Sequence, residues 1–246
     1  MLAGVHLSTG VVRTGSDLAL VLSGLAIAAM ASAALVMTYV VTWAADQVLA
    51  VPLVPALLQV VPPDSGVRGT VIAVGLNVLT LLCFLVVMRL SPLSGYHAAE
   101  HKVIGAIEHF GEPTVDRARA MPRAHQRCGS NLLAGVLPLL LVGIPLFQYY
   151  PALAAILTIF GWTFRFQTGY LIQMIFATKE PTDKQLRAGL ESARKLLYLW
   201  RQDPYKRVPP LVNLWQRGFL QTFAGLIAGM YALEMLYNHL HIFLDF

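Results

Sequence analysis

The segment YHAAEH, residues 96–101, contains two histidines and a glutamate within little more than one turn of a predicted helix. His97 and His101 are four residues apart, so on a helix their side chains share one face, with Glu100 beside them. This is the H-x-x-E-H spacing of an inverted zincin. The spacing predicts a pair of metal-binding histidines and, in Glu100, a candidate catalytic base.

A second pair of donors follows in the segment HQRC, where His125 and Cys128 stand close to the start of a predicted helix. The positive N-terminal end of that helix and the neighbouring Arg123 and Arg127 all favour the thiolate form of Cys128. Thiolate is the form of cysteine that binds metal. The segment therefore predicts two further metal ligands.

The number of ligands decides between two interpretations of the predicted site. If His97, His101, His125 and Cys128 all bind, the site is closed and structural, whereas three ligands leave an open position for water, with Glu100 as general base. Oxygen donors are few around the motif, which favours zinc over magnesium. The competing interpretation is an ordinary solvated helical face. Four of the seven histidines, including the three predicted ligands, and one of the two cysteines fall within 32 residues, and this clustering favours the metal site.

Glu108 and His109 are interpreted as surface residues, and Glu108 is also a candidate acid to hydrogen bond a metal-binding histidine.

The composition indicates an integral membrane protein. Of 246 residues, 57% are hydrophobic and only 13% are charged, and the mean hydropathy is +0.62, whereas soluble domains carry about 25% charged residues. Five apolar runs approach or exceed the roughly 20 residues that cross a bilayer: about 17–45, 67–90, 131–149, 152–177 and 218–243. We therefore predict an all-α polytopic protein whose residues 1–246 form a single membrane domain.

The distribution of Lys and Arg predicts which side of the membrane each connection occupies. Residues 89–127 hold six of these cations and residues 179–217 hold nine, whereas residues 46–66 and 148–152 hold none. By the positive-inside rule the N-terminus and the metal-site segment, 91–129, are cytoplasmic. The net charge of +5 thus reflects membrane topology, and no motif supports nucleic-acid binding.

The histidines need short elements to position them. The pattern in residues 91–129 predicts a helical hairpin in which Ser94 caps the first helix, Gly111 ends it and Thr114 caps the second. A further segment, 182–201, has a predicted capping box at its start and apolar residues at helical spacing. We expect it to form an amphipathic helix that lies on the anionic inner leaflet.

Two charged residues, Arg165 and Glu234, fall inside predicted spans, where a charge is unfavourable by about 2.5 to 3.5 kcal/mol on insertion scales. One interpretation is an ion pair between the fourth and fifth spans. The other is that Arg165 anchors an anionic substrate or lipid headgroup.

The quoted motifs resemble the signature of the YqhQ-like family of bacterial membrane proteins, which are described as predicted metal-dependent enzymes. The similar segments are YHAAEHKVIGAIEHFGEPTVDRAR, HQRCGSNLL and LIQMIFATKEPTDKQLRAGLESARKLL, which lie within about residues 91–200. The N-terminal block and the last span depart from the pattern, and Phe164 and Arg165 stand where it has a Tyr-Glu pair.

The resemblance implies a divalent metal cofactor and a bacterial plasma-membrane location. It carries the family's polar positions onto His97, Glu100, His101, His125, Cys128, Gln173 and Glu180, with Glu180 as an additional oxygen ligand or an acid that supports one.

Two functions from different classes follow. The first is metal-assisted hydrolysis of a peptide or lipid substrate at the cytoplasmic interface. The second is a non-enzymatic assembly or scaffold subunit whose closed metal site stabilises the hairpin. The expected partners are the lipid bilayer and either other membrane proteins or further copies of the chain. Transport is a third, weaker hypothesis, which no inverted repeat supports.

Overall fold

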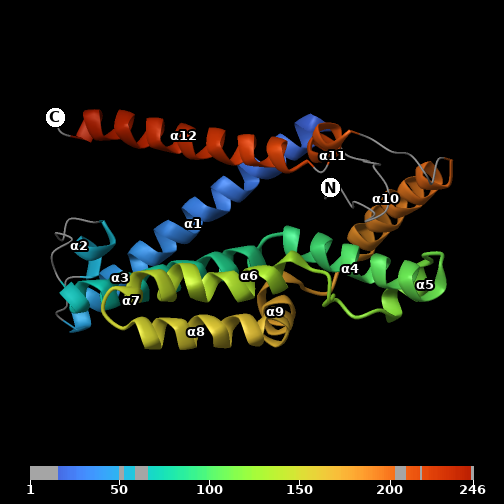
Figure 1. The fold of residues 1–246 in the computed structure, drawn as a ribbon. Helices are drawn as coiled ribbons and strands as arrows, with labels where there is room; N and C mark the ends of the chain where they lie inside the picture. Colours follow the sequence, from blue (N-terminus) through green and yellow to red (C-terminus); the bar gives the residue numbers. More distant parts are fainter. Residues whose placement is uncertain (1–15, 50–52, 59–65, 203–208, 217, 245–246) are drawn as a thin grey trace. The chain divides into compact units, whose positions relative to one another are not determined.

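The computed structural model describes residues 16–49, 53–58, 66–202, 209–216 and 218–244. Within these ranges every regular element is a helix (Figure 1). This confirms the all-α prediction. Helices suit a lipid setting because a backbone surrounded by lipid must satisfy its own hydrogen bonds, and a helix does so within one segment. The N-terminal block that departs from the family pattern, residues 1–15, lies outside the described residues.

Among the described residues, four helical stretches are long and apolar enough to cross a membrane. They are α1 (Asp17–Leu49), α3 (Gly66–Leu90), the continuous run Gly129–Phe147 and α12 (Phe219–Leu244), which qualifies over Phe219–Leu236. The run Gly129–Phe147 joins α6 (Gly129–Pro138), the π-helical η1 (Leu139–Gly143) and α7 (Ile144–Phe147). Each stretch coincides with a predicted span, and together they indicate a lipid-bilayer setting.

The remaining predicted span, 152–177, is divided in the structure into α8 (Pro151–Thr163), α9 (Arg165–Ile172) and the π-helical η2 (Gln173–Ala177). Phe164 breaks the run, with φ −95° and ψ 13°. The 13 residues of α8 rise about 20 Å, less than the roughly 30 Å hydrocarbon core. The predicted count of five spans is therefore not confirmed.

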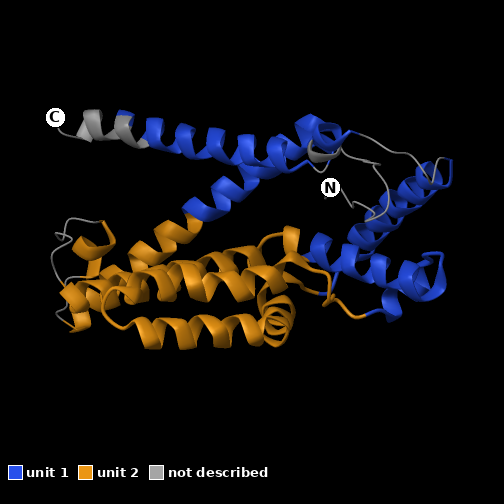
Figure 2. Cartoon of the chain, in the orientation of Figure 1, with its two compact units in different colours: residues 1–32, 95–121, 180–246 blue, residues 33–94, 122–179 orange. Residues whose placement is uncertain are grey.

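Two compact units alternate along the chain (Figure 2). Unit 1 comprises residues 1–32, 95–121 and 180–246, and unit 2 comprises residues 33–94 and 122–179.

In unit 2, α6 packs along α8 and α9, and glycines allow the close approach. A Cβ at Gly135 of α6 would lie 2.9 Å from Cε3 of Trp162 and 3.2 Å from the side chain of Arg165. A Cβ at Gly169 of α9 would lie 2.1 Å from Oδ1 and 2.7 Å from Cα of Asn131 on α6. Small residues at such positions are typical of helix packing in membranes, because they let backbones approach closely.

In unit 1, the core joins α4 (Leu93–Phe110), α5 (Val115–Ala120) and α10 (Asp183–Gln202). Its buried residues are Ala99, Val103, Ala106, Ala118, Leu186, Leu190 and Ala193. The apolar face of α10 thus packs on the hairpin of α4 and α5. The expectation that this face lies on a lipid leaflet is not confirmed, because protein already covers it.

Local capping accounts for where these helices begin and end. Gly111 has a left-handed φ of +75° after α4, and the Thr114 hydroxyl caps α5, as predicted. The capping box of α10 is also confirmed, since Gln185 Oε1 accepts from the Thr182 N–H at 2.9 Å and Thr182 Oγ1 accepts from the Gln185 N–H at 3.3 Å. The prediction for Ser94 is wrong: α4 begins one residue earlier, and the Ser94 hydroxyl donates to a carbonyl three residues before it, at 3.0 Å.

Glycines also bring α1 and α12 together within unit 1. A Cβ at Gly24 would lie 2.0 Å from the carbonyl oxygen of Thr222, and a Cβ at Gly225 would lie 2.0 Å from that of Val21. The last span, which departs from the family pattern in the sequence, is therefore packed closely against the first.

Candidate metal-binding site

His97 and His101 lie on one face of α4, as their spacing predicts. Their ring centroids are 4.3 Å apart and the ring planes are inclined by 61°. His101 is buried and His97 is half-buried, next to the fully buried Ala98 and Ala99. Two imidazoles at i and i+4 are suited to binding one ion from the same side.

The second donor pair lies in the loop that leads into α6. Cys128 is the residue before the first turn of α6, with φ −66° and ψ 137°, so its sulfur stands where the helix dipole favours negative charge. The hydroxyl of Ser130 donates to Cys128 Sγ at 3.2 Å. The Nδ1 of His125 accepts from the backbone N–H of Arg127 at 3.2 Å. The predicted placement of Cys128 at a helix N-terminus is therefore confirmed.

A buried amide network fixes this loop to the end of α9. Gln173 is 1% exposed, and its Oε1 accepts from the backbone N–H of His125 at 2.7 Å. Its Nε2 donates to Oδ1 of Asn131 at 3.1 Å, and Asn131 in turn donates to the carbonyl of Gln126 at 2.6 Å. Satisfied buried networks of this kind hold a single conformation. Gln173, which entered only through the resemblance, thus positions the predicted ligand loop.

Three of the four predicted donors form a group that could hold a metal ion. His97, His101 and Cys128 each offer one ligand atom, and these atoms all lie within 4.8 Å of one another. His125 is not a member of this group. Two nitrogens and one sulfur are donors that zinc accepts, and three protein ligands leave one position of a tetrahedral site open.

The predicted acids are placed at different distances from the histidines along α4. Glu100 is half-buried and precedes His101 directly. Glu108 is exposed, and the seven residues that separate it from His101 correspond to about 10 Å along the helix axis. Of the two, Glu100 stands next to the donor group. Its role as a base stays a prediction, as does a role for Glu108 in supporting a ligand.

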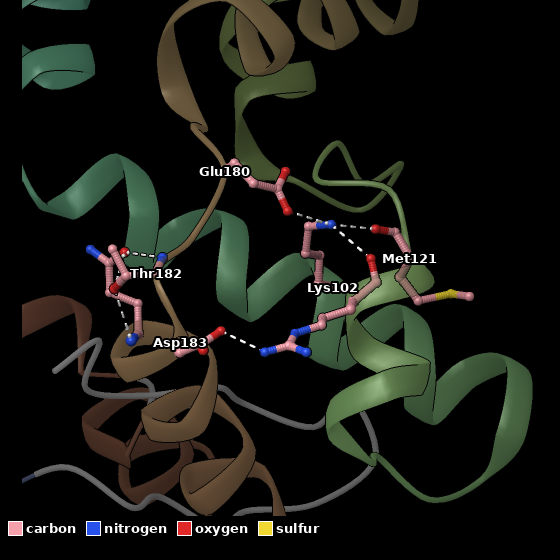
Figure 3. Close-up of polar contacts among 7 residues, drawn as sticks. Lys102, Met121, Glu180, Thr182 and Asp183 are labelled. Atoms are coloured by element: carbon pink, nitrogen blue, oxygen red, sulfur yellow. Dashed lines mark hydrogen bonds and ion pairs between the residues drawn. The ribbon is translucent and has the colours of Figure 1, made fainter.

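Glu180 forms an ion pair with Lys102, the residue that follows His101 (Figure 3). The Lys102 Nζ lies 3.0 Å from Glu180 Oε1, and the lysine side chain is 7% exposed. Lys102 Nζ also donates to the backbone carbonyls of Arg119 at 3.1 Å and Met121 at 2.9 Å. One buried ammonium thus connects the histidine helix to the end of α5 and to the start of α10. A role for Glu180 as a metal ligand stays a prediction.

Sequence reasoning did not single out Lys102, although a signal was present. Positions 99, 102, 103 and 106 lie on one face of the helix, and the other three residues are Ala, Val and Ala. A lysine on such a face must find acceptors, because an unpaired buried charge is strongly unfavourable.

A second ion pair lies beside the first, between Arg119 Nη2 and Asp183 Oδ1 at 2.7 Å (Figure 3). The hydrogen bond that Arg119 donates to the Asp183 carboxylate, together with the negative charge of that carboxylate, raises the pKa of the Arg119 guanidinium above its usual value. Both side chains are more than half exposed, so this pair contributes little stability.

Arg165 lies at the start of α9, where its guanidinium carbon is 4.6 Å from the ring centroid of Trp162 and 4.4 Å from that of Phe166. Its Nη1 donates to the carbonyl of Trp162 at 2.8 Å. Glu234 is an exposed residue of α12. An ion pair between Arg165 and Glu234 stays a prediction.

The fold and the donor group define a class of protein: a helical membrane protein with side chains that could hold a metal. The chain belongs to the family described as "Protein of unknown function (DUF1385)", whose profile matches residues 18–166. The chain is also 29% identical over 177 residues to the "Uncharacterized protein YqhQ" of Bacillus subtilis (strain 168). That segment is 60% of this chain and 56% of the relative, so the chain spans about half of the relative's length. No solved structure matches the chain.

These comparisons confirm the family resemblance and change its extent. The match begins in the first span, well before residue 91, and it ends at residue 166. The donor group and Glu100 fall inside it, whereas Gln173 and Glu180 fall beyond its end.

Proposed function

We propose that the protein is a metal-dependent hydrolase of the bacterial plasma membrane, with zinc held by His97, His101 and Cys128. The observation that carries the proposal is the convergence of three ligand atoms within 4.8 Å, next to a helical glutamate with the spacing of a zinc-site base. When bound, zinc supplies a Lewis acid that lowers the pKa of water to about 7.

The remaining chemistry belongs to the protein's own side chains. Glu100 follows the first histidine by three residues and precedes the second directly, and in this position it accepts the proton of the attacking water. The buried His101 and the amide-fixed loop around Cys128 keep the donors in place. Such preorganisation contributes to catalysis because the groups need not reorganise during the reaction.

The substrate class follows from the setting. The H-x-x-E-H motif begins at His97, seven residues after the C-terminal end of α3 (Gly66–Leu90), an apolar helix with Arg89 in its last turn. The flanking segment, 89–127, carries six Lys and Arg, which favours the cytoplasmic side. A site at this level meets peptide or lipid substrates at the membrane surface.

A closed structural site in an assembly subunit is the alternative. It is supported by the hydrogen bond from the His125 backbone N–H to Gln173, which fixes the loop close to Cys128. In that protein His125 supplies the fourth ligand, and the metal stabilises the hairpin without catalysis.

Metal content distinguishes the two functions. The full chain, purified in detergent, should contain about one zinc, and both the His97→Ala/His101→Ala double variant and Cys128→Ser should lose it. His109→Ala is the matched control, because His109 is exposed on the same helix. An open site retains zinc in His125→Ala, whereas a closed site loses it. Wild-type protein without metal would overturn both versions.

The catalytic base is tested separately. We expect the zinc-loaded protein to hydrolyse at least one member of a panel of fluorogenic peptide and phospholipid ester substrates in mixed micelles. Glu100→Gln should retain zinc and lose about 10²- to 10⁴-fold in rate, with Glu108→Gln as control. A zinc-loaded wild type that hydrolyses none of the panel would refute the hydrolase. An unaffected Glu100→Gln variant would refute the role of Glu100 as the base.

A further inference from the structure

Unit 2 contains an open cavity of about 660 Å³ beside the ligand loop. It is lined by Gln126, Phe166, Gln167, Tyr170 and Leu171. Three of these side chains are aromatic or aliphatic, and two carry amides at which a polar group can be oriented. The volume lies in the range of small-molecule sites. We propose that this cavity, together with Arg165, binds one anionic phospholipid.

Arg165 supplies the charge for this site. Its guanidinium lies over Phe166, which is also a wall of the cavity, and of its five N–H groups one donates to the carbonyl of Trp162. From residue 117 to residue 179 the sequence contains no Asp or Glu. The cation therefore stands in a stretch of sequence without acids. Guanidinium geometry matches carboxylates and phosphates, so a phosphate is the partner that we expect here.

The position of Arg165 is determined by packing. Its Cβ and Cδ lie against Gly135 of α6, where an added Cβ would be 3.2 Å from each. Gly135 is six residues from Gly129, the first residue of α6, which corresponds to about 9 Å along the axis. Arginines in membrane proteins lay their stems along apolar surface and extend their heads toward the polar boundary. That boundary is where phospholipid phosphates are found.

The lining then selects the rest of the ligand. Phe166, Tyr170 and Leu171 are each about half exposed and give an acyl chain an apolar surface, while Gln126 and Gln167 offer amide donors to its ester carbonyls. A zwitterionic lipid also brings a cationic group, for which residues 117–179 offer no acid. The chemistry therefore favours a phospholipid with net negative charge.

This inference is independent of the hydrolase. It uses none of the proposed metal ligands, so metal-free protein should bind the lipid as well as zinc-loaded protein does. If the lipid does not bind, the conclusions from the metal-content experiments still stand. If the protein holds no metal, the expected lipid binding is unchanged.

The test is native mass spectrometry of the delipidated full chain, titrated with phosphatidylglycerol or phosphatidylcholine of identical acyl chains. We expect one phosphatidylglycerol per chain, bound about tenfold more tightly than phosphatidylcholine, as one charge-assisted contact allows. Arg165→Gln should remove this preference, and Arg165→Lys should retain part of it. Tyr170→Ala should weaken both lipids equally, and Arg194→Gln, an exposed control on α10, should change nothing.

Two results would overturn the proposal. Equal affinity of the wild type for both lipids would exclude charge recognition, and this comparison needs no variant to fold. The second result is that glycerol phosphate, which has no acyl chains, competes as well as phosphatidylglycerol. The cavity would then make no contribution to lipid binding, and Arg165 would bind only an anion.

Discussion

Replacing Lys102 with methionine tests the connection between the histidine helix and the rest of unit 1. Methionine preserves most of the length and apolar volume of the side chain, and it removes the ammonium that donates to the carbonyls of Arg119 and Met121. It also removes the ion pair with Glu180. The substitution therefore isolates the three polar contacts of one buried group.

The magnitude follows from the exposure of the partners. Hydrogen bonds to charged groups contribute about 1.5 to 3 kcal/mol each, so two carbonyls give about 3 to 6 kcal/mol. Glu180 is 68% exposed, and an exposed ion pair contributes about 0 to 1 kcal/mol. Lys102→Met should thus lower the free energy of unfolding by about 3 kcal/mol or more, and Glu180→Gln by about 1 kcal/mol at most.

The assay is thermal unfolding of the full chain in one detergent at one scan rate, followed by circular dichroism. For a chain of this size about 1 kcal/mol corresponds to roughly 2 to 4 °C, so Lys102→Met should lower the midpoint by about 6 °C or more. Lys184→Met, an exposed lysine of α10, is the matched control and should leave the midpoint nearly unchanged. If Lys102→Met behaves like this control, the buried-ammonium account is refuted. If Glu180→Gln is equally damaging, the acid and not the carbonyls carries the stability.

Two further substitutions test unit 2. Gly169→Ala should strongly reduce thermal stability, because its Cβ would overlap Oδ1 and the backbone of Asn131. The control is Gly75→Ala, whose added Cβ would have nothing within 4 Å and should stabilise α3 by up to about 1 kcal/mol. Equal unfolding midpoints of the two variants would contradict the close approach of α6 and α9. Gln173→Leu should weaken zinc binding by about 10- to 100-fold without removing a ligand, as loss of a supporting hydrogen bond does at metal sites. The zinc affinity is measured by competition with a chelator, and an unchanged affinity would show that the loop around His125 keeps its conformation without Gln173.

Much of the architecture followed from one-dimensional patterns. Long apolar runs predicted five spans, because a span must bury about 20 residues in lipid, and four of these runs coincide with long apolar helices among the described residues. Gly111 and Thr114 predicted the hairpin ends because left-handed φ and N-cap geometry are local requirements. The spacing of His97 and His101 predicted a shared face for the same reason.

Two predictions that were not confirmed concern how the helices are divided and packed. Residues 152–177 look like one span by hydropathy, but Phe164 breaks the helix and places Arg165 beside Trp162. The apolar face of α10 looks like a lipid-binding surface, because amphipathicity does not reveal whether lipid or protein covers it. In the structure the small residues of α4 and α5 cover it.

The sequence by itself determined the helical class, the membrane setting and the candidate metal-binding residues, because each depends on composition or on spacing within a few residues. Tertiary structure alone decided which donors meet, that Lys102 satisfies two carbonyls and an acid, and that Gln173 holds the ligand loop. Those pairings join residues between 17 and 78 positions apart, and the sequence carries no local signal for them, since they depend on how the helices pack.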